Sequence, residues 1–112
     1  VGVGMAKQMI YTARNIKAPE ALRIGLVNAV YPIEELMVAA KKMASMIASN
    51  APIAVRNCKK AINDGLQTDI ESGVAIEEKL FGDCFETEDQ RYGMAFFLDR
   101  NKDKVKEPFK NK

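Results

Sequence analysis

The residues best suited to binding chemistry lie near the end of the chain, where aromatic side chains gather beside an arginine. Phe97 and Arg100 are three residues apart, so a helix would place both on one side. Stacking on the phenyl ring and the guanidinium charge together suit an aromatic, phosphorylated ligand, with a cation–π contribution of about 0.5–2 kcal/mol. The alternative is core packing beside a surface arginine, and we favour packing for Phe85 and Phe96.

Residues suited to catalysis are scarce. The sequence contains no histidine, which removes the usual general base near neutral pH and any Ser-His-Asp set. The glutamate pairs at 34–35 and 77–78 are adjacent, so on a helix they point about 100° apart and are better explained as solvated surface. The opening VGVG at residues 1–4 lacks the third glycine and the preceding strand of a dinucleotide-binding loop. The residues alone therefore predict no catalytic site.

The two cysteines do not form a metal-binding pattern. Cys58 and Cys84 are far apart in the sequence, show no CxxC spacing and have no histidine to complete a zinc site. We interpret both as reduced thiols on apolar helix faces, which favours a cytoplasmic protein. No metal and no cofactor is predicted.

Composition and charge narrow the class of protein further. The 112 residues are 47% apolar and 29% charged, as in one small globular domain. The net charge of +2 is too small to predict a nucleic-acid partner, and no apolar run is long enough for a membrane helix.

Helical periodicity dominates the chain. The clearest pattern predicts a helix over about 33–49, with Pro32 at its first position and acidic residues at 34 and 35 near the positive end of the dipole. Asn50 is the predicted N-cap of the next helix, and Gly65 is predicted to end it in the left-handed conformation. Other helices are expected at 5–13, 19–24 (ended by Gly25), 68–85 and 87–100, the last two opened by the capping boxes at 68–71 and 87–90.

One segment does not fit a purely helical chain. Residues 26–31, LVNAVY, read as a strand with no second strand to pair with. Its backbone groups would need a sheet from elsewhere, so we expect a sheet-bearing segment before Val1. The basic tail, residues 101–112, is expected to fray. The predicted fold is all-α, five or six helices with one orphan strand, with uncovered apolar faces that promote self-association or looseness.

Three stretches resemble the crotonase (enoyl-CoA hydratase/isomerase) superfamily, in order and along essentially the whole chain. Residues 18–27, APEALRIGLV, are similar to an A-x-E-A-x-x-x-G-L-V segment of the family. Residues 50–52, NAP, with KKA at 59–61 resemble the helix pair that follows. Residues 85–97, FETEDQRYGMAFF, resemble the closing T-x-D-x-x-E-G-M-x-A-F block. The resemblance is strongest to the C-terminal part of bacterial short-chain enoyl-CoA hydratases, the 3-hydroxybutyryl-CoA dehydratase type.

The resemblance implies a fold and an activity. Residues 1–100 would form the helical C-terminal subdomain of the crotonase fold, which builds the oligomer interface and covers the coenzyme A site. Family members reversibly add water to a 2-enoyl-CoA in fatty acid metabolism. Two glutamates act on one water, and two backbone N–H groups polarise the thioester carbonyl. These motifs lie upstream of the matched segment, so no residue of this chain is expected to be catalytic.

The resemblance also implies binding residues and partners. Phe97 matches an aromatic residue at the coenzyme A adenine. Arg100 matches a position usually held by a lysine that meets a coenzyme A phosphate, and Phe81 matches an aromatic residue of the acyl pocket. Arginine for lysine keeps the charge but exchanges a point charge for a planar fork. The expected partners are an acyl-CoA substrate and further copies of the chain in a trimer or hexamer, with no nucleic acid and no membrane.

Two other functions stay open at this point. A helical module for oligomerisation or binding, with no catalysis, fits the same residues. Another crotonase-fold enzyme, an isomerase or a hydrolase, also fits, because the superfamily shares this half of the fold and differs in its catalytic carboxylates.

Overall fold

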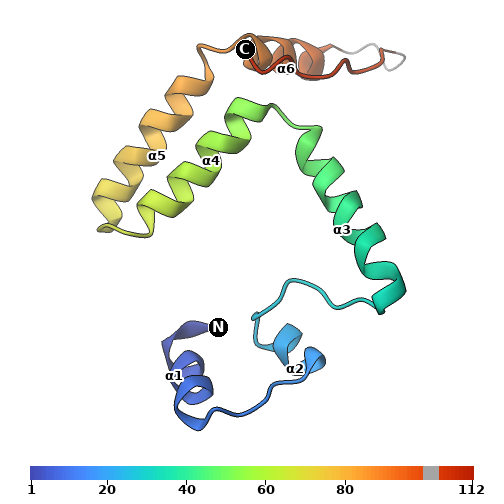
Figure 1. Cartoon of the computed structure of the whole chain (residues 1–112). Coiled ribbons are helices and arrows are strands. Elements are labelled where there is room, and N and C mark those ends of the chain that lie inside the picture. The colour runs from blue at the N-terminus through green and yellow to red at the C-terminus, as the bar shows by residue number, and fades with distance from the viewer. Residues whose placement is uncertain (100–103) are drawn as a thin grey trace. The chain divides into compact units, whose positions relative to one another are not determined.

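The computed structural model describes residues 1–99 and 104–112, and this part of the chain is helical with no strand (Figure 1). The all-α prediction is therefore confirmed, while the orphan strand is not found. The chain divides into two compact units, residues 1–42 and 43–112. The helices are α1 (Gly2–Thr12), α2 (Ala18–Arg23), α3 (Ile33–Ala48), α4 (Pro52–Gly65), α5 (Ile70–Cys84) and α6 (Glu88–Leu98).

The first unit shows why the strand prediction for residues 26–31 was wrong. Helix α2 ends at Arg23, and Gly25 follows two residues later with a φ of 72° that suits a residue without Cβ. The chain then turns back, and the N–H groups of Leu26 and Val27 donate to the Ala21 carbonyl at 2.9 and 3.4 Å. These backbone groups are satisfied locally, and residues 26–31 form a bend and an irregular segment.

Helix α3 matches its predicted range of about 33–49, except that Pro32 is not its first residue. Pro32 lies just before the helix, and its carbonyl accepts the N–H groups of Glu35 and Leu36 at 3.0 and 3.1 Å. The apolar stripe that predicted the helix is exposed in the described chain, with Ile33 at 82% and Met37 at 61%. Since the only buried apolar residues described are Ala21 and Leu80, most of the predicted apolar faces have no cover.

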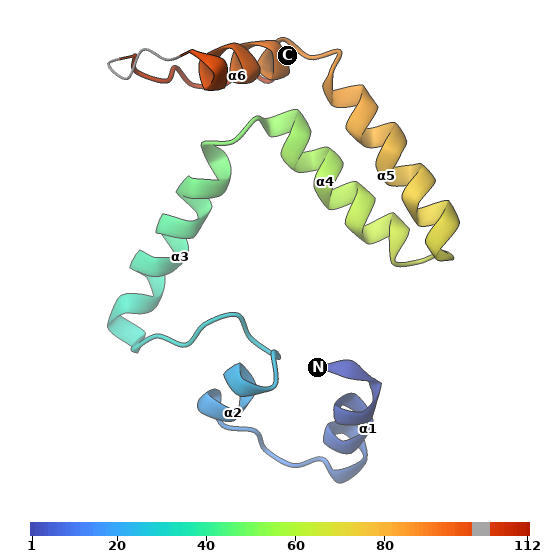
Figure 2. The same ribbon diagram turned by 180° about the vertical axis from the view of Figure 1, so that it is seen from behind.

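Helices α4 and α5 run side by side in both views and share the only extensive helix–helix interface in the described residues (Figures 1 and 2). The predicted role of Gly65 was wrong: it lies within α4, and Leu66 ends the helix in a right-handed conformation. Gly65 instead faces Gly73 of α5, where an added Cβ on Gly73 would lie 3.2 Å from the Gly65 carbonyl oxygen. The two glycines therefore allow the backbones to approach closely.

Two of the predicted caps differ in the structure. Ala51, not Asn50, is the N-cap of α4, because the Asn50 amide donates back to the Met46 carbonyl at 3.1 Å. The cap of α5 is Asp69 rather than Thr68, and its carboxylate accepts the Ser72 N–H at 2.9 Å. Hydrogen bonds from the Ser72 backbone and side chain lower the pKa of Asp69 to about 2.

The start of α6 agrees with its prediction, and the tail does not. Thr87 caps α6 by accepting the Gln90 N–H at 3.1 Å. The tail was predicted to fray, and this prediction was wrong for residues 104–112, which fold back along α6. The reason is a set of specific partners, the buried carboxylate of Asp89 foremost, that the polar composition of the tail did not reveal.

In the part of the chain that the structure describes, none of the helices is long and apolar enough to cross a membrane.

Candidate functional site

A hollow of about 310 Å³ lies along the α4–α5 pair. Phe81 contributes to its wall and is 66% exposed, so its ring is available for contact. Most of the lining is apolar, with one carboxylate and one amide, as in sites for apolar ligands that are oriented by a few polar groups. The lining residues are Asn57, Cys58, Ala61, Ile62, Glu77, Leu80, Phe81 and Cys84.

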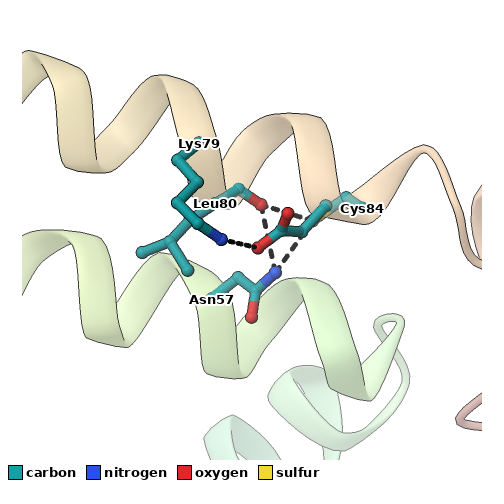
Figure 3. Close-up of polar contacts among 5 residues, drawn as sticks. Asn57, Lys79, Leu80 and Cys84 are labelled. Carbon is teal, nitrogen blue, oxygen red and sulfur yellow. Dashed lines mark hydrogen bonds and ion pairs between the residues drawn. The ribbon is translucent and has the colours of Figure 1, made fainter.

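Two polar side chains of this hollow, those of Asn57 and Cys84, form hydrogen bonds within the α4–α5 pair (Figure 3). The Asn57 amide of α4 donates to the Leu80 carbonyl of α5 at 3.0 Å and contacts the Cys84 sulfur at 3.5 Å. The Cys84 thiol in turn donates to the Leu80 carbonyl at 3.3 Å. On the exposed side, Lys79 forms an ion pair with Asp83 at 3.0 Å. Asn57 therefore fixes how the two helices meet and leaves the wall of the hollow apolar.

The cysteines are free thiols, as interpreted from the sequence. Both Cys58 and Cys84 line the hollow, but the described residues contain no group of three or more His, Cys, Asp or Glu side chains able to hold a metal ion. The arrangement offers packing for an apolar group beside two free thiols.

The aromatic residues separate into two groups. Phe81 and Phe85 make an edge-to-face pair on α5, with ring centroids 5.1 Å apart at 75°. Phe85 is nevertheless 52% exposed, so the predicted core packing is only partial in the described chain. Phe96 is half-buried against Tyr92, with centroids 6.2 Å apart, which agrees with a packing role.

Phe97 is the most exposed phenylalanine, at 81%, and lies in the last turn of α6. It does not line the α4–α5 hollow to which Phe81 contributes. Arg100, its predicted partner, lies outside the described residues. Beside that segment, an ion pair at 2.8 Å joins Asp99 to Lys104 and raises the pKa of the Lys104 ammonium.

Sequence reasoning missed Asp89, the only buried charged residue in the described part of the chain. Its carboxylate accepts backbone N–H groups from Lys110 and Asn111. The sequence signal was its place in the capping box of α6, which explains an acid in the first turn but not a partner in the tail.

A sequence profile of the enoyl-CoA hydratase/isomerase family matches residues 1–109. This match covers almost the whole chain, which therefore belongs to that family. The resemblance seen in the three sequence stretches is therefore confirmed.

Named relatives narrow the comparison. The chain is 55% identical over all 112 residues to a short-chain-enoyl-CoA hydratase of Clostridium acetobutylicum, and 53% identical over 102 residues to a crotonyl-CoA hydratase of Syntrophomonas wolfei. These alignments cover 100% and 91% of this chain but 42% and 39% of the relatives. The chain thus spans about two fifths of the length of these relatives.

Solved structures support the same fold. The crystal structure of an enoyl-CoA hydratase from Bacillus anthracis matches the whole chain with a TM-score of 0.91 at 40% identity, over 42% of its own length. An enoyl-CoA hydratase subunit from Geobacillus kaustophilus gives a TM-score of 0.87 at 33% identity.

Proposed function

We propose that this chain is the helical C-terminal part of a short-chain enoyl-CoA hydratase, and that the protein carrying it reversibly hydrates substrates such as crotonyl-CoA. The observation that supports this most strongly is the 55% identity, over the full 112 residues, to a relative named short-chain-enoyl-CoA hydratase. The chain itself is proposed to contribute binding and assembly and no catalytic residue, since the family resemblance implies that the catalytic motifs lie upstream of the matched segment.

The proposed role of Phe97 is to stack on the adenine of coenzyme A. Its 81% exposure supports the proposal, because a phenyl ring without cover retains its full surface for a planar ligand. Arg100 is proposed, on its sequence position alone, to meet a coenzyme A phosphate. A guanidinium offers several N–H donors in a fork that suits phosphate oxygens.

Phe81 is proposed to line the acyl pocket. The apolar hollow beside it supports this role, since a short acyl chain has only methylene and methyl groups to bury. Each buried CH₂ contributes about 0.8 kcal/mol, so burial of a four-carbon acyl chain adds only modest affinity.

In this proposal the chemistry belongs to residues outside the chain: two glutamates that act on one water, and two N–H groups that polarise the thioester carbonyl. The residues of this chain would hold the nucleotide and the acyl group while that chemistry proceeds. Orienting a bound substrate lowers the barrier because less entropy remains to be lost in the transition state.

The full-length protein is further proposed to assemble into a trimer or hexamer and to lie in the cytoplasm. The exposed apolar stripe of α3 supports it, because a surface that includes Ile33, Met37 and Ile47 needs cover from other protein. The free cysteines suit a reducing compartment.

The test is a hydration assay on the full-length protein that carries this chain. Loss of the conjugated thioester absorbance of crotonyl-CoA, with 3-hydroxybutyryl-CoA as product, is the expected result. Conversion of a 3-enoyl-CoA to the 2-enoyl isomer without hydration would identify an isomerase. Release of free coenzyme A thiol would identify a hydrolase. Binding of acyl-CoA with none of these reactions would favour the assembly or binding module.

A further inference from the structure

We propose that Asp89 is a positioning residue whose carboxylate clasps residues 107–112 onto α6, and that this clasp holds Phe97 in the orientation that binds coenzyme A. The clause on coenzyme A rests on the function proposed above.

The centre of the clasp is a buried carboxylate with backbone partners. Asp89 is 3% exposed, and its Oδ1 and Oδ2 accept the N–H groups of Lys110 and Asn111 at 2.7 and 2.8 Å. Its own N–H donates to the Lys112 carbonyl at 3.2 Å. An ionised carboxylate is costly to bury unless it is hydrogen-bonded, and charge-assisted bonds of this length are among the stronger ones. Asp89 therefore provides a strong reason for the tail to stay on α6.

Two further contacts place the tail on one face of α6. The Glu107 N–H donates to the Tyr92 hydroxyl at 2.6 Å. The Phe109 ring meets Tyr92 edge-on at 5.9 Å and lies 3.4 Å from where a Cβ on Gly93 would sit. Positions 89, 92 and 93 follow the i, i+3, i+4 spacing of one helix face. The tail thus covers a continuous stripe of the first two turns.

The tail also links α6 to the rest of its unit. Among the described helices, α6 has no extensive interface with another helix. The Arg56 guanidinium of α4 donates to the Asn111 side chain at 2.9 Å. Asn111 directly follows Lys110, whose N–H donates to Asp89. The clasp therefore connects α6 to α4 through the tail, which restrains how α6 lies against the α4–α5 pair.

Phe97 lies at the edge of the clasped face. It follows Gly93 by four residues, so it is on the same side of α6 and one turn further along. Opening the clasp would free the tail and let α6 adopt several orientations. A ligand that binds one of them then shows an apparent dissociation constant raised in inverse proportion to the population of that orientation.

The test compares Asp89→Asn with Asp83→Asn in the full-length protein. Both variants replace one carboxylate by an amide, but Asp83 lies in an exposed ion pair with Lys79. A further clasp variant, Lys110→Pro, leaves Asp89 intact and removes the Lys110 N–H that the Asp89 carboxylate accepts. The readouts are amide exchange in the tail and α6, and steady-state kinetics with crotonyl-CoA and with crotonyl-pantetheine, which lacks the nucleotide.

The expected result is a matched response to both clasp variants. Asp89→Asn and Lys110→Pro speed exchange at residues 107, 111 and 94–98 about tenfold or more, and Asp83→Asn leaves it unchanged. The KM for crotonyl-CoA rises about tenfold if one orientation in ten stays competent, with kcat changed less than twofold. The KM for crotonyl-pantetheine stays the same, because that substrate has no adenine for Phe97 to contact.

Three results would overturn the inference. Unchanged α6 exchange in a variant with a released tail would show that the clasp does not hold the helix. An equal rise in KM for both thioesters would show a general loss of structure rather than a loss at the nucleotide. If Lys110→Pro leaves amide exchange in the tail unchanged, the Asp89 carboxylate does not hold the tail on α6. If the unmodified protein binds no coenzyme A, the proposed function fails, and the exchange data still decide whether Asp89 clasps the tail.

Discussion

The close approach of α4 and α5 at Gly65 and Gly73 makes a quantitative prediction for alanine substitutions. In Gly73→Ala the new Cβ would lie 3.2 Å from the Gly65 carbonyl oxygen and 3.4 Å from its Cα, so two backbones must separate. Overpacking of this kind costs about 1–3 kcal/mol, and the gain in helix propensity returns about 1 kcal/mol. We expect a net destabilisation of about 0–2 kcal/mol.

A matched control lies in the same helix. A Cβ on Gly82 of α5 meets nothing within 4 Å, so Gly82→Ala keeps the propensity gain without the steric cost. Gly65→Ala is intermediate, since its Cβ would lie 3.7 Å from the Gly73 Cα, an ordinary contact. The difference between Gly73→Ala and Gly82→Ala should therefore equal the steric term, about 1–3 kcal/mol.

Native-state amide exchange across α4 and α5 measures this difference in the 112-residue chain, because it reports local opening whether or not other segments unfold with it. A gap of 1–3 kcal/mol corresponds to about fivefold to 150-fold in the opening equilibrium. Equal protection of α4 and α5 in the Gly73→Ala and Gly82→Ala variants would refute the close-approach reasoning.

Two further predictions concern the helix caps. The folded-state pKa of Asp69 is about 2, below its usual 3.8, so its stabilisation of α5 is present above about pH 4 and lost as pH falls through 2. The Ser72 amide signal should report this loss in pH-titrated NMR spectra, and Asp69→Asn should flatten it; an unchanged titration in the variant would contradict the assignment. Thr87→Ala should destabilise α6 by about 1–2 kcal/mol, because Thr87 accepts the Gln90 N–H and donates to the Cys84 carbonyl. Thr68→Ala should cost only a few tenths, since Asp69 is the cap of α5; equal losses of circular-dichroism helicity would show that the cap is misplaced.

Elements with a local cause were predictable from the sequence. The range of α3 follows from apolar residues at helical spacing, and the Thr87 cap follows from a hydroxyl three residues before Gln90. Both depend on residues within one turn of each other, which a sequence displays directly.

Features that depend on distant partners were not predictable. Residues 26–31 have strand composition, but their first N–H groups donate to Ala21, a contact that the pattern of side chains does not encode. A glycine at position 65 could either end a helix in the left-handed conformation or allow a neighbouring backbone to approach closely. Only the position of Gly73 shows that the second role applies. The tail looked free because its partner, Asp89, lies about 20 residues earlier and had a sufficient local explanation.

The candidate site shows the same division. The family resemblance predicts Phe81 and Phe97 as site residues, and the structure shows only that both are exposed. Phe81 adjoins the α4–α5 hollow, whereas Phe97 does not line it. This difference arises from the packing of α4 against α5. Spacing within one helix carries no such information.

The most direct test of the central claim is crotonyl-CoA turnover by the 112-residue chain beside the full-length protein that carries it, at equal concentration. We predict hydration by the full-length protein alone, because the chain is proposed to supply contacts to the substrate and no catalytic group. Turnover by the 112-residue chain would contradict the absence of catalytic residues, and inactivity of both would contradict the hydratase assignment.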